Sequence, residues 1–106
     1  MKNKFPFKTV KLINSTAKII MFDDNTTVKE LKGNEGVAER TNGKLFLNSS
    51  STSARMKQTF LHELIHLLDD TPGLRYLTEA QVEILSMRLL HFMQNNPQII
   101  EYLVKK

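Results

Sequence analysis

The hydrophobic pattern of this chain changes once, near residue 50, and this change constrains the fold more than any other feature. Before it, runs rich in β-branched and aromatic residues are separated by polar residues, as in strands; these runs are residues 7–13, 17–22, 36–41 and 44–48. After it, apolar residues recur at helical spacing from Ala54 to Leu68 and from Thr78 to about Gln94. Strands followed by helices predict an α+β fold, and 106 residues suit a single domain, residues 1–106.

Turn residues give the expected connections in the first half. Asn42-Gly43 lies between two strand-like runs and predicts a two-residue hairpin, because both residues tolerate positive φ. Asp23–Thr27 predicts a turn that leads into a short helical piece, Val28–Leu31. The expected result is a small, mostly antiparallel sheet of three or four strands.

The helices of the second half have recognisable ends. The loop Ser49–Ser53 is expected to end in a helix N-cap, and Thr71-Pro72-Gly73 to stop the first helix. Thr78-Glu79-Ala80-Gln81 has the sequence of a capping box. Pro97 suits the first position of a short last helix, Gln98–Val104. The second helix is apolar on nearly all sides, which predicts extensive burial.

Composition and charge narrow the classes of function. The chain has no cysteine, which excludes disulfides, thiol nucleophiles and cysteine metal sites. No apolar run is long enough to span a bilayer, and Met1–Pro6 lacks the apolar core of a secretory signal, so we expect a cytoplasmic location and no membrane. Residues 1–57 hold 11 of the 15 Lys and Arg but 5 of the 11 Asp and Glu. A solvated lysine-rich surface explains this asymmetry better than a nucleic-acid partner, because no recognition motif or aromatic platform accompanies it.

The residues suited to chemistry lie in one pentapeptide, His62-Glu63-Leu64-Ile65-His66, within the first long helix. Histidines at i and i+4 project from one face of a helix, so both imidazoles can reach a single ion. Zinc accepts neutral imidazole nitrogens and keeps one position for water in catalytic sites. Glu63 adjoins the first histidine and can take the proton of an attacking water. The pattern predicts a hydrolytic zinc site.

A third ligand must come from elsewhere, and the second helix carries three candidates. Glu79 lies in the first turn, where the helix dipole favours a carboxylate without a ligand role. Glu83 lies one turn further, among apolar residues, where a carboxylate is costly unless it is paired or bound to metal. His91 is a lone histidine, more often a satisfied core residue than a ligand. Glu83 is the preferred candidate, and Glu79 could replace it geometrically.

Asp69 and Asp70 are weaker candidates because they share the helix with both histidines. Asp70 lies about 12 Å along the axis from His62 at 1.5 Å per residue, too far for three ligands to converge. We expect the two aspartates to orient His66 as hydrogen-bond acceptors, or simply to end the helix.

This arrangement resembles a known group of enzymes. The pentapeptide, followed by a helix that carries Glu83-Ile84-Leu85-Ser86, resembles the gluzincin zinc peptidases. The small size resembles the minigluzincins and the compact phage and bacterial metallopeptidases of the ImmA/IrrE type. The resemblance covers roughly Gly36 to Leu103. In thermolysin-like members an aspartate follows the serine and supports a zinc histidine, whereas this chain has Met87 there, so that role is unassigned.

The resemblance implies a minimal zincin-like metallopeptidase that cleaves polypeptide substrates. It implies Zn²⁺ held by His62, His66 and Glu83, with Glu63 as the catalytic base that later returns the proton to the leaving amine. It also implies that an exposed sheet edge near residues 36–48 pairs with extended substrate, as β-augmentation allows. Which of the two hairpin strands forms this edge is not decided by the sequence.

Two further expectations concern the surroundings of the site. Arg75, Tyr76 or His91 could act as a second electrophile beside the zinc. The segment Pro97–Lys106 is short and apolar, and small relatives of the resembling group are held inactive by C-terminal segments. We therefore expect it to block the cleft and keep the enzyme latent, to complete the core, or to mediate a homodimer.

Two alternatives from other classes remain open. In one, the chain is a zincin-like interaction module, with or without zinc, that no longer turns over. In the other, it is a DNA-associated accessory protein that uses the basic first half. Zinc content and the salt dependence of DNA binding separate these alternatives, because phosphate contacts release counterions.

Overall fold

The strands of the first half form one four-stranded sheet. The computed structural model describes residues 4–69 and 75–106. The strands are β1 (Thr9–Lys11), β2 (Thr16–Phe22), β3 (Gly36–Glu39) and β4 (Lys44–Asn48), in the sheet order β1-β2-β4-β3. β1 is shorter than the predicted run 7–13, whereas β4 coincides with the predicted run 44–48.

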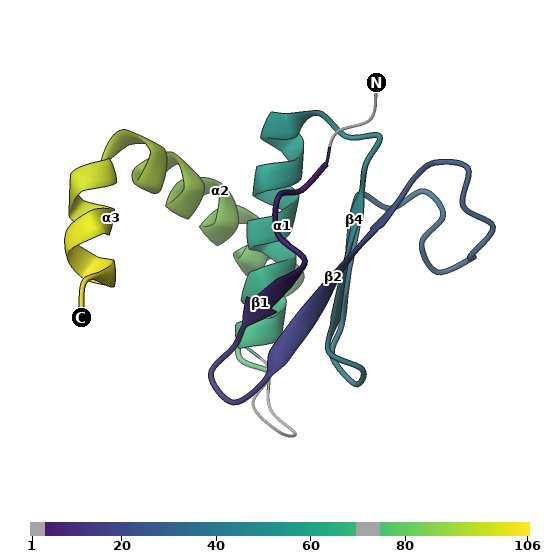
Figure 1. The fold of residues 1–106 in the computed structure, drawn as a ribbon, viewed down its shortest axis with the longest axis horizontal. Helices are drawn as coiled ribbons and strands as arrows, with labels where there is room; N and C mark the ends of the chain where they lie inside the picture. Colours follow the sequence, from purple (N-terminus) through teal and green to yellow (C-terminus); the bar gives the residue numbers. More distant parts are fainter. Residues whose placement is uncertain (1–3, 70–74) are drawn as a thin grey trace.

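The sheet is mixed, with a parallel pair at its centre. β1 with β2, and β3 with β4, pair antiparallel as expected, but β2 and β4 pair in parallel. After β2 the chain runs to the outer edge of the sheet, forms β3, and returns as β4 between β3 and β2 (Figure 1). β3 is therefore an edge strand, which decides the point that the sequence left open.

Two local predictions of the first half are wrong in detail. The β3–β4 loop has four residues, 40–43, because Glu39 is the register partner of Lys44. Gly43 has φ +60°, but Asn42 does not have positive φ, so the two-residue turn does not form. Val28–Leu31 is a single hydrogen-bonded turn, closed by bonds from Leu31 and Lys32 to the carbonyl of Val28, and not a helix.

The predicted helix ends are largely confirmed. The helices are α1 (Ser53–Leu68), α2 (Glu79–Asn95) and α3 (Pro97–Val104). The Thr52 side chain caps α1 by accepting from the Arg55 amide, and both bonds of the Thr78–Gln81 capping box are present. Pro97 is the first residue of α3. The predicted stop at Thr71-Pro72-Gly73 lies outside the described residues.

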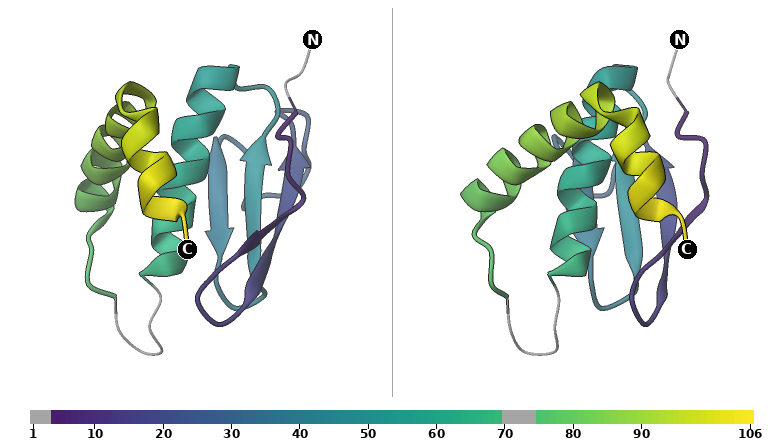
Figure 2. Two further views of the ribbon diagram at one scale, coloured as in Figure 1. Left: turned by 60° about the vertical axis from the view of Figure 1, so that its left-hand side comes forward. Right: turned by 90° about the vertical axis from the view of Figure 1, so that its left-hand side faces the viewer.

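The elements stack in three layers: the sheet, then α1, then α2 with α3 (Figure 2). α1 packs on β3 and β4 over a core of five buried side chains, Ala17, Leu45, Leu47, Met56 and Leu67. α2 packs on α1, and α3 packs on α2 and on no other described element. Across the described ranges, no helix combines the length and apolar content needed to cross a membrane.

The predicted burial of α2 is wrong. Val82 and Ser86 are buried in this helix, whereas several of its large apolar side chains are exposed, namely Ile84, Leu85, Met87, Leu89 and Phe92. One side of α2 faces α1 and α3 packs against the helix as well, but no other described element covers the rest of it.

Gly36 lets β3 approach α1 closely. A Cβ atom at this position would lie 2.5 Å from Cγ2 of Thr59, 3.1 Å from the carbonyl oxygen of Phe46 and 3.3 Å from Cγ of Glu63. Real Cβ atoms almost never come within 3.0 Å of another heavy atom. The absence of a side chain at residue 36 therefore sets the spacing between the edge strand and the pentapeptide helix.

We expect Gly36→Ala to destabilise the fold by about 1–3 kcal/mol, the usual cost of forcing extra atoms into a packed contact. Thermal unfolding monitored by circular dichroism measures this loss. Thr59→Ser removes the nearest methyl, so the Gly36→Ala/Thr59→Ser double variant should regain part of the stability through a positive coupling. An unchanged melting temperature in Gly36→Ala would contradict the close approach.

Candidate metal centre

α1 places the three pentapeptide residues at one point over the edge strand. His62 and His66 lie one helical turn apart, with ring centroids 5.0 Å apart. Their side chains are 10% and 14% exposed, and that of Glu63 is 13% exposed. One ligand atom from each of these residues lies within 4.8 Å of the others. The spacing predicted from sequence thus produces a cluster that could hold a metal ion.

Glu63 is a buried carboxylate between the histidines and β3. Burial raises its pKa above the ordinary range, and the charges of His62 and His66 act against this rise. The backbone N–H of Ala38 on β3 also favours the ionised form by donating to the carboxylate. A raised pKa near two histidines is typical of a general base.

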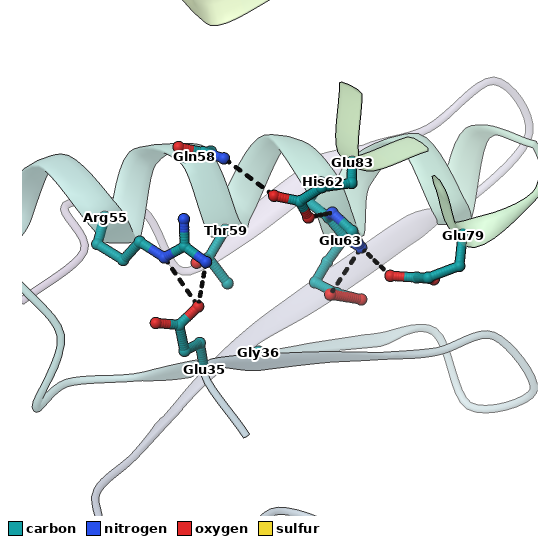
Figure 3. A pocket seen from close by; sticks show the side chains of 9 residues that line it. All are labelled: Glu35, Gly36, Arg55, Gln58, Thr59, His62, Glu63, Glu79 and Glu83. Carbon is teal, nitrogen blue, oxygen red and sulfur yellow. Dashed lines mark hydrogen bonds and ion pairs between the residues drawn. The ribbon is translucent and has the colours of Figure 1, made fainter. Parts of the chain in front are cut away.

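Two carboxylates from α2, those of Glu79 and Glu83, lie against His62 (Figure 3). The Glu79 carboxylate touches both imidazoles, with Oε1 at 2.7 Å from Nε2 of His62 and Oε2 at 2.8 Å from Nε2 of His66. Glu83 contacts the other ring nitrogen of His62, with Oε2 at 2.8 Å from Nδ1. The two Nε2 atoms therefore converge on Glu79, and Glu83 lies behind the His62 ring.

The start of α2 is tied to the end of α1 by one side chain. Asp69 is the C-cap of α1, and its two carboxylate oxygens accept from the backbone amides of Tyr76 and Leu77, at 3.1 and 3.0 Å. These bonds hold the chain two residues before Glu79. Asp69 therefore fixes where α2 begins. Among the described residues it forms no hydrogen bond to His66, and Asp70 lies outside them.

Other side chains hold the centre from behind. Nε2 of Gln58 donates to Oε1 of Glu83 at 3.2 Å, which orients the carboxylate that contacts His62. Nε of Arg40 donates to the carbonyl of His66 at 3.3 Å, and its Nη2 lies 3.3 Å from Nδ1 of the same residue. Sequence reasoning missed Gln58 and Arg40, because neither belongs to a motif and only packing brings them here.

The centre opens into two adjoining pockets. The first, about 170 Å³, lies toward the start of α1 and is lined by Glu35, Gly36, Arg55, Gln58, Thr59, His62, Glu63, Glu79 and Glu83. The second, about 430 Å³, lies toward its end and is lined by Gly36, Val37, Ala38, Arg40, Glu63, His66, Arg75, Leu77 and Glu79. Both share Glu63, Glu79 and the edge strand, so the cluster lies midway along a cleft beside β3.

The remaining predicted site residues are not gathered there. His91 is exposed on α2, about 18 Å along the helix from Glu79, and does not belong to the cluster. Tyr76 is exposed and lines neither pocket, whereas Arg75 lines the second. Among the sequence candidates for a second electrophile, Arg75 is the one at the cleft.

The donors present suit a divalent metal such as zinc. Two Nε2 atoms face the same small volume. The Glu79 carboxylate already contacts both, with one oxygen on each nitrogen, and Glu63 borders the same space. Glu83 on Nδ1 of His62 is the carboxylate–histidine arrangement that leaves Nε2 to bind a metal. For His66 to do the same, its proton must move to Nδ1, so the contact with Arg40 must loosen.

Comparison with known proteins adds no further information, because no family model, curated protein or solved structure matches the chain.

In metal-free protein, we expect Glu63→Gln to raise the melting temperature at pH 7 by a few degrees. The raised pKa means that folding costs free energy once Glu63 ionises, so this cost is absent at acid pH and grows as pH rises through the folded-state pKa. The difference between the variant and the unchanged protein should therefore shrink toward pH 4. Calorimetric scans in chelator across this range provide the test, and a Glu63→Gln protein that is less stable at pH 7 would contradict it.

Proposed function

We propose that the chain is a zinc-dependent metallopeptidase. The observation that carries the proposal is the cluster of His62, Glu63 and His66 in a cleft beside an edge strand. Two imidazoles, a carboxylate base and an unpaired strand edge are the parts that metal-assisted peptide hydrolysis requires. The resemblance of the sequence motifs to those of gluzincins supports the same proposal independently of the fold.

We assign the zinc ligands as His62, His66 and Glu79, with Glu83 as a positioning residue. Both Nε2 atoms face Glu79, whereas Glu83 contacts Nδ1, on the opposite side of the His62 ring. This geometry favours Glu79, which the sequence left open as an alternative, over Glu83, which was the preferred candidate from the sequence. Glu79 and Glu83 lie one helical turn apart, which explains why their order was hard to decide from the sequence.

Zinc in such a site lowers the pKa of bound water and polarises the scissile carbonyl. Glu63 accepts a proton from the attacking water and delivers it to the amine nitrogen when the C–N bond breaks. Overall, one water molecule is consumed and one peptide C–N bond is broken, which leaves a new carboxyl group and a new amine.

Extended polypeptide is the proposed substrate class. β3 pairs with β4 on one side, and its other side faces the cleft that contains Glu63. A peptide added to this edge would lie past the cluster, with backbone hydrogen bonds supplying affinity. The Ala38 N–H donates to Glu63 in the free protein, so substrate binding and release of the base are linked.

Latency and location stay predictions. No residue of α3 lines either cleft pocket, and α3 packs on α2, so blocking of the cleft by this helix would require a movement or a second chain. A cytoplasmic location rests on the sequence features given above.

The second candidate function is a metal-free interaction module. It is favoured by one observation: without any ion, both nitrogens of His62 and of His66 already have a carboxylate or guanidinium neighbour. A cluster satisfied in this way can persist as a structural device. Zinc binding and hydrolysis distinguish the two candidates, and nothing in the described residues adds weight to the DNA-associated alternative.

We expect Glu79→Gln to weaken zinc affinity more than Glu83→Gln does. Loss of a residue that orients a ligand typically costs about 10–100-fold in metal affinity, and loss of a ligand should exceed that. Competition titration with a chromophoric chelator measures both, with the exposed Glu101→Gln as a matched control that should bind as the unchanged protein does. A larger loss in Glu83→Gln would return the ligand role to Glu83.

We expect Glu63→Gln to keep zinc and to lose hydrolysis by about 10²–10⁴-fold or more, because the residue moves protons and is not a ligand. Cleavage of a mixture of extended peptides, followed by mass spectrometry, gives the rate, and metal analysis gives zinc content. If the unchanged protein binds no zinc and cleaves nothing, the metal-free interaction module is favoured. Undiminished cleavage by Glu63→Gln would eliminate the proposed role of this base.

A further inference from the structure

Large apolar side chains are exposed along both α2 and α3. Nine large apolar side chains on the two helices are 38–77% exposed: Ile84, Leu85, Met87, Leu89, Phe92, Ile99, Tyr102, Leu103 and Val104. We call them the α2–α3 apolar surface. At these exposures their area is on the order of 1,000 Å². The largest apolar patch on a typical monomer is about 300–600 Å².

α3 in particular lacks the burial that normally stabilises a helix. It has eight residues, none of them buried, and it packs on α2 alone among the described elements. Isolated helices shorter than about 12–15 residues are marginal in water, and tertiary packing of an apolar face supplies most helix stability. Figures 1 and 2 show α3 at the far end of α2, away from the sheet. A further surface is needed to cover it.

We propose that this surface is the interface of a two-fold homodimer, in which α2 and α3 of one copy pack on α2 and α3 of a second copy. A stable interface takes about 800 Å² from each partner, and the α2–α3 apolar surface can supply that area. Four helices packed in this way would bury the apolar sides that α1 leaves open, as in a helix bundle.

The charge of the surface fits a second copy better than a charged partner. Glu79 and Glu83 of α2 face the histidines of α1, and Lys105 and Lys106 follow the end of α3. Between them, residues 84–104 contain one Arg and one Glu, Arg88 and Glu101, so this stretch carries no net charge, while the chain as a whole carries +4. In a two-fold interface each surface meets itself, so a net charge would repel its own copy. The neutral part of this basic chain is thus the part that can self-associate, whereas an acidic partner would be drawn to the lysine-rich first half.

The dimer would also affect the metal centre, although it does not depend on the proposed activity. α2 carries Glu79 and Glu83 toward the histidines and exposes its apolar residues on its other sides. A second copy would therefore hold the carboxylate-bearing helix from outside. Dimerisation would thereby help to fix the positions of Glu79 and Glu83 in the cleft.

Sedimentation velocity of the full chain, between about 1 and 100 μM, tests the proposal. We expect a monomer–dimer equilibrium that is dimeric at the upper end. Phe92→Glu on α2 and Leu103→Glu on α3 should each shift it to monomer by at least tenfold in dissociation constant. Ile13→Glu, in the β1–β2 turn and 82% exposed in the unchanged protein, is the matched control and should stay dimeric.

A second measurement avoids dependence on the folding of these variants. Because the chain has no cysteine, Tyr102→Cys introduces a single thiol at an exposed position. Under mild oxidation it should give cross-linked dimers faster than Ile13→Cys does. A protein that is monomeric at every concentration overturns the proposal, as does dimerisation unaffected by both glutamate variants. Growth into open-ended oligomers would exclude the two-fold form, and a monomer that binds neutral phosphatidylcholine vesicles would give the surface to lipid instead.

Discussion

The contact between α1 and the edge strand is the constraint on which the site depends. Gly36 has no side chain, and a Cβ there would overlap Thr59 and press on Glu63. The pentapeptide can therefore lie directly over β3, with the Ala38 amide within reach of the Glu63 carboxylate. The same approach leaves β3 as one wall of the cleft and puts the base, the histidines and the strand edge within one small volume.

The position of the other wall depends on short-range polar bonds as well as on the packing of Val82 between α2 and its neighbours. Asp69 binds the amides of Tyr76 and Leu77, and the Thr78–Gln81 capping box starts α2 directly afterwards. These bonds define the residue at which the second helix begins. Since a helix advances 1.5 Å and turns 100° per residue, a shift of one residue would turn both carboxylates away from the imidazoles. Precise placement of two glutamates thus comes from caps more than from burial.

The many apolar residues of α2 do not make it a core helix, because several of its large apolar side chains are exposed. A helix that is apolar all round is usually buried in a core. Among the described elements only α1 and α3 pack on α2, so much of its surface is left uncovered. The surplus apolar surface lies on the outermost layer, where association would cover it and hold α2 from outside.

The sequence by itself determined the class of fold, the helix ends and the grouping of His62, Glu63 and His66. All three depend on residues close together along the chain. The change of periodicity, the caps at Thr52 and Thr78, and the i, i+4 spacing of His62 and His66 are local properties. Tertiary structure alone decided that β2 and β4 pair in parallel. The same alternation of apolar and polar residues is compatible with parallel and with antiparallel pairing. It also decided which glutamate faces both Nε2 atoms: Glu79 and Glu83 share a helix face, and only the position of α2 along α1 distinguishes them.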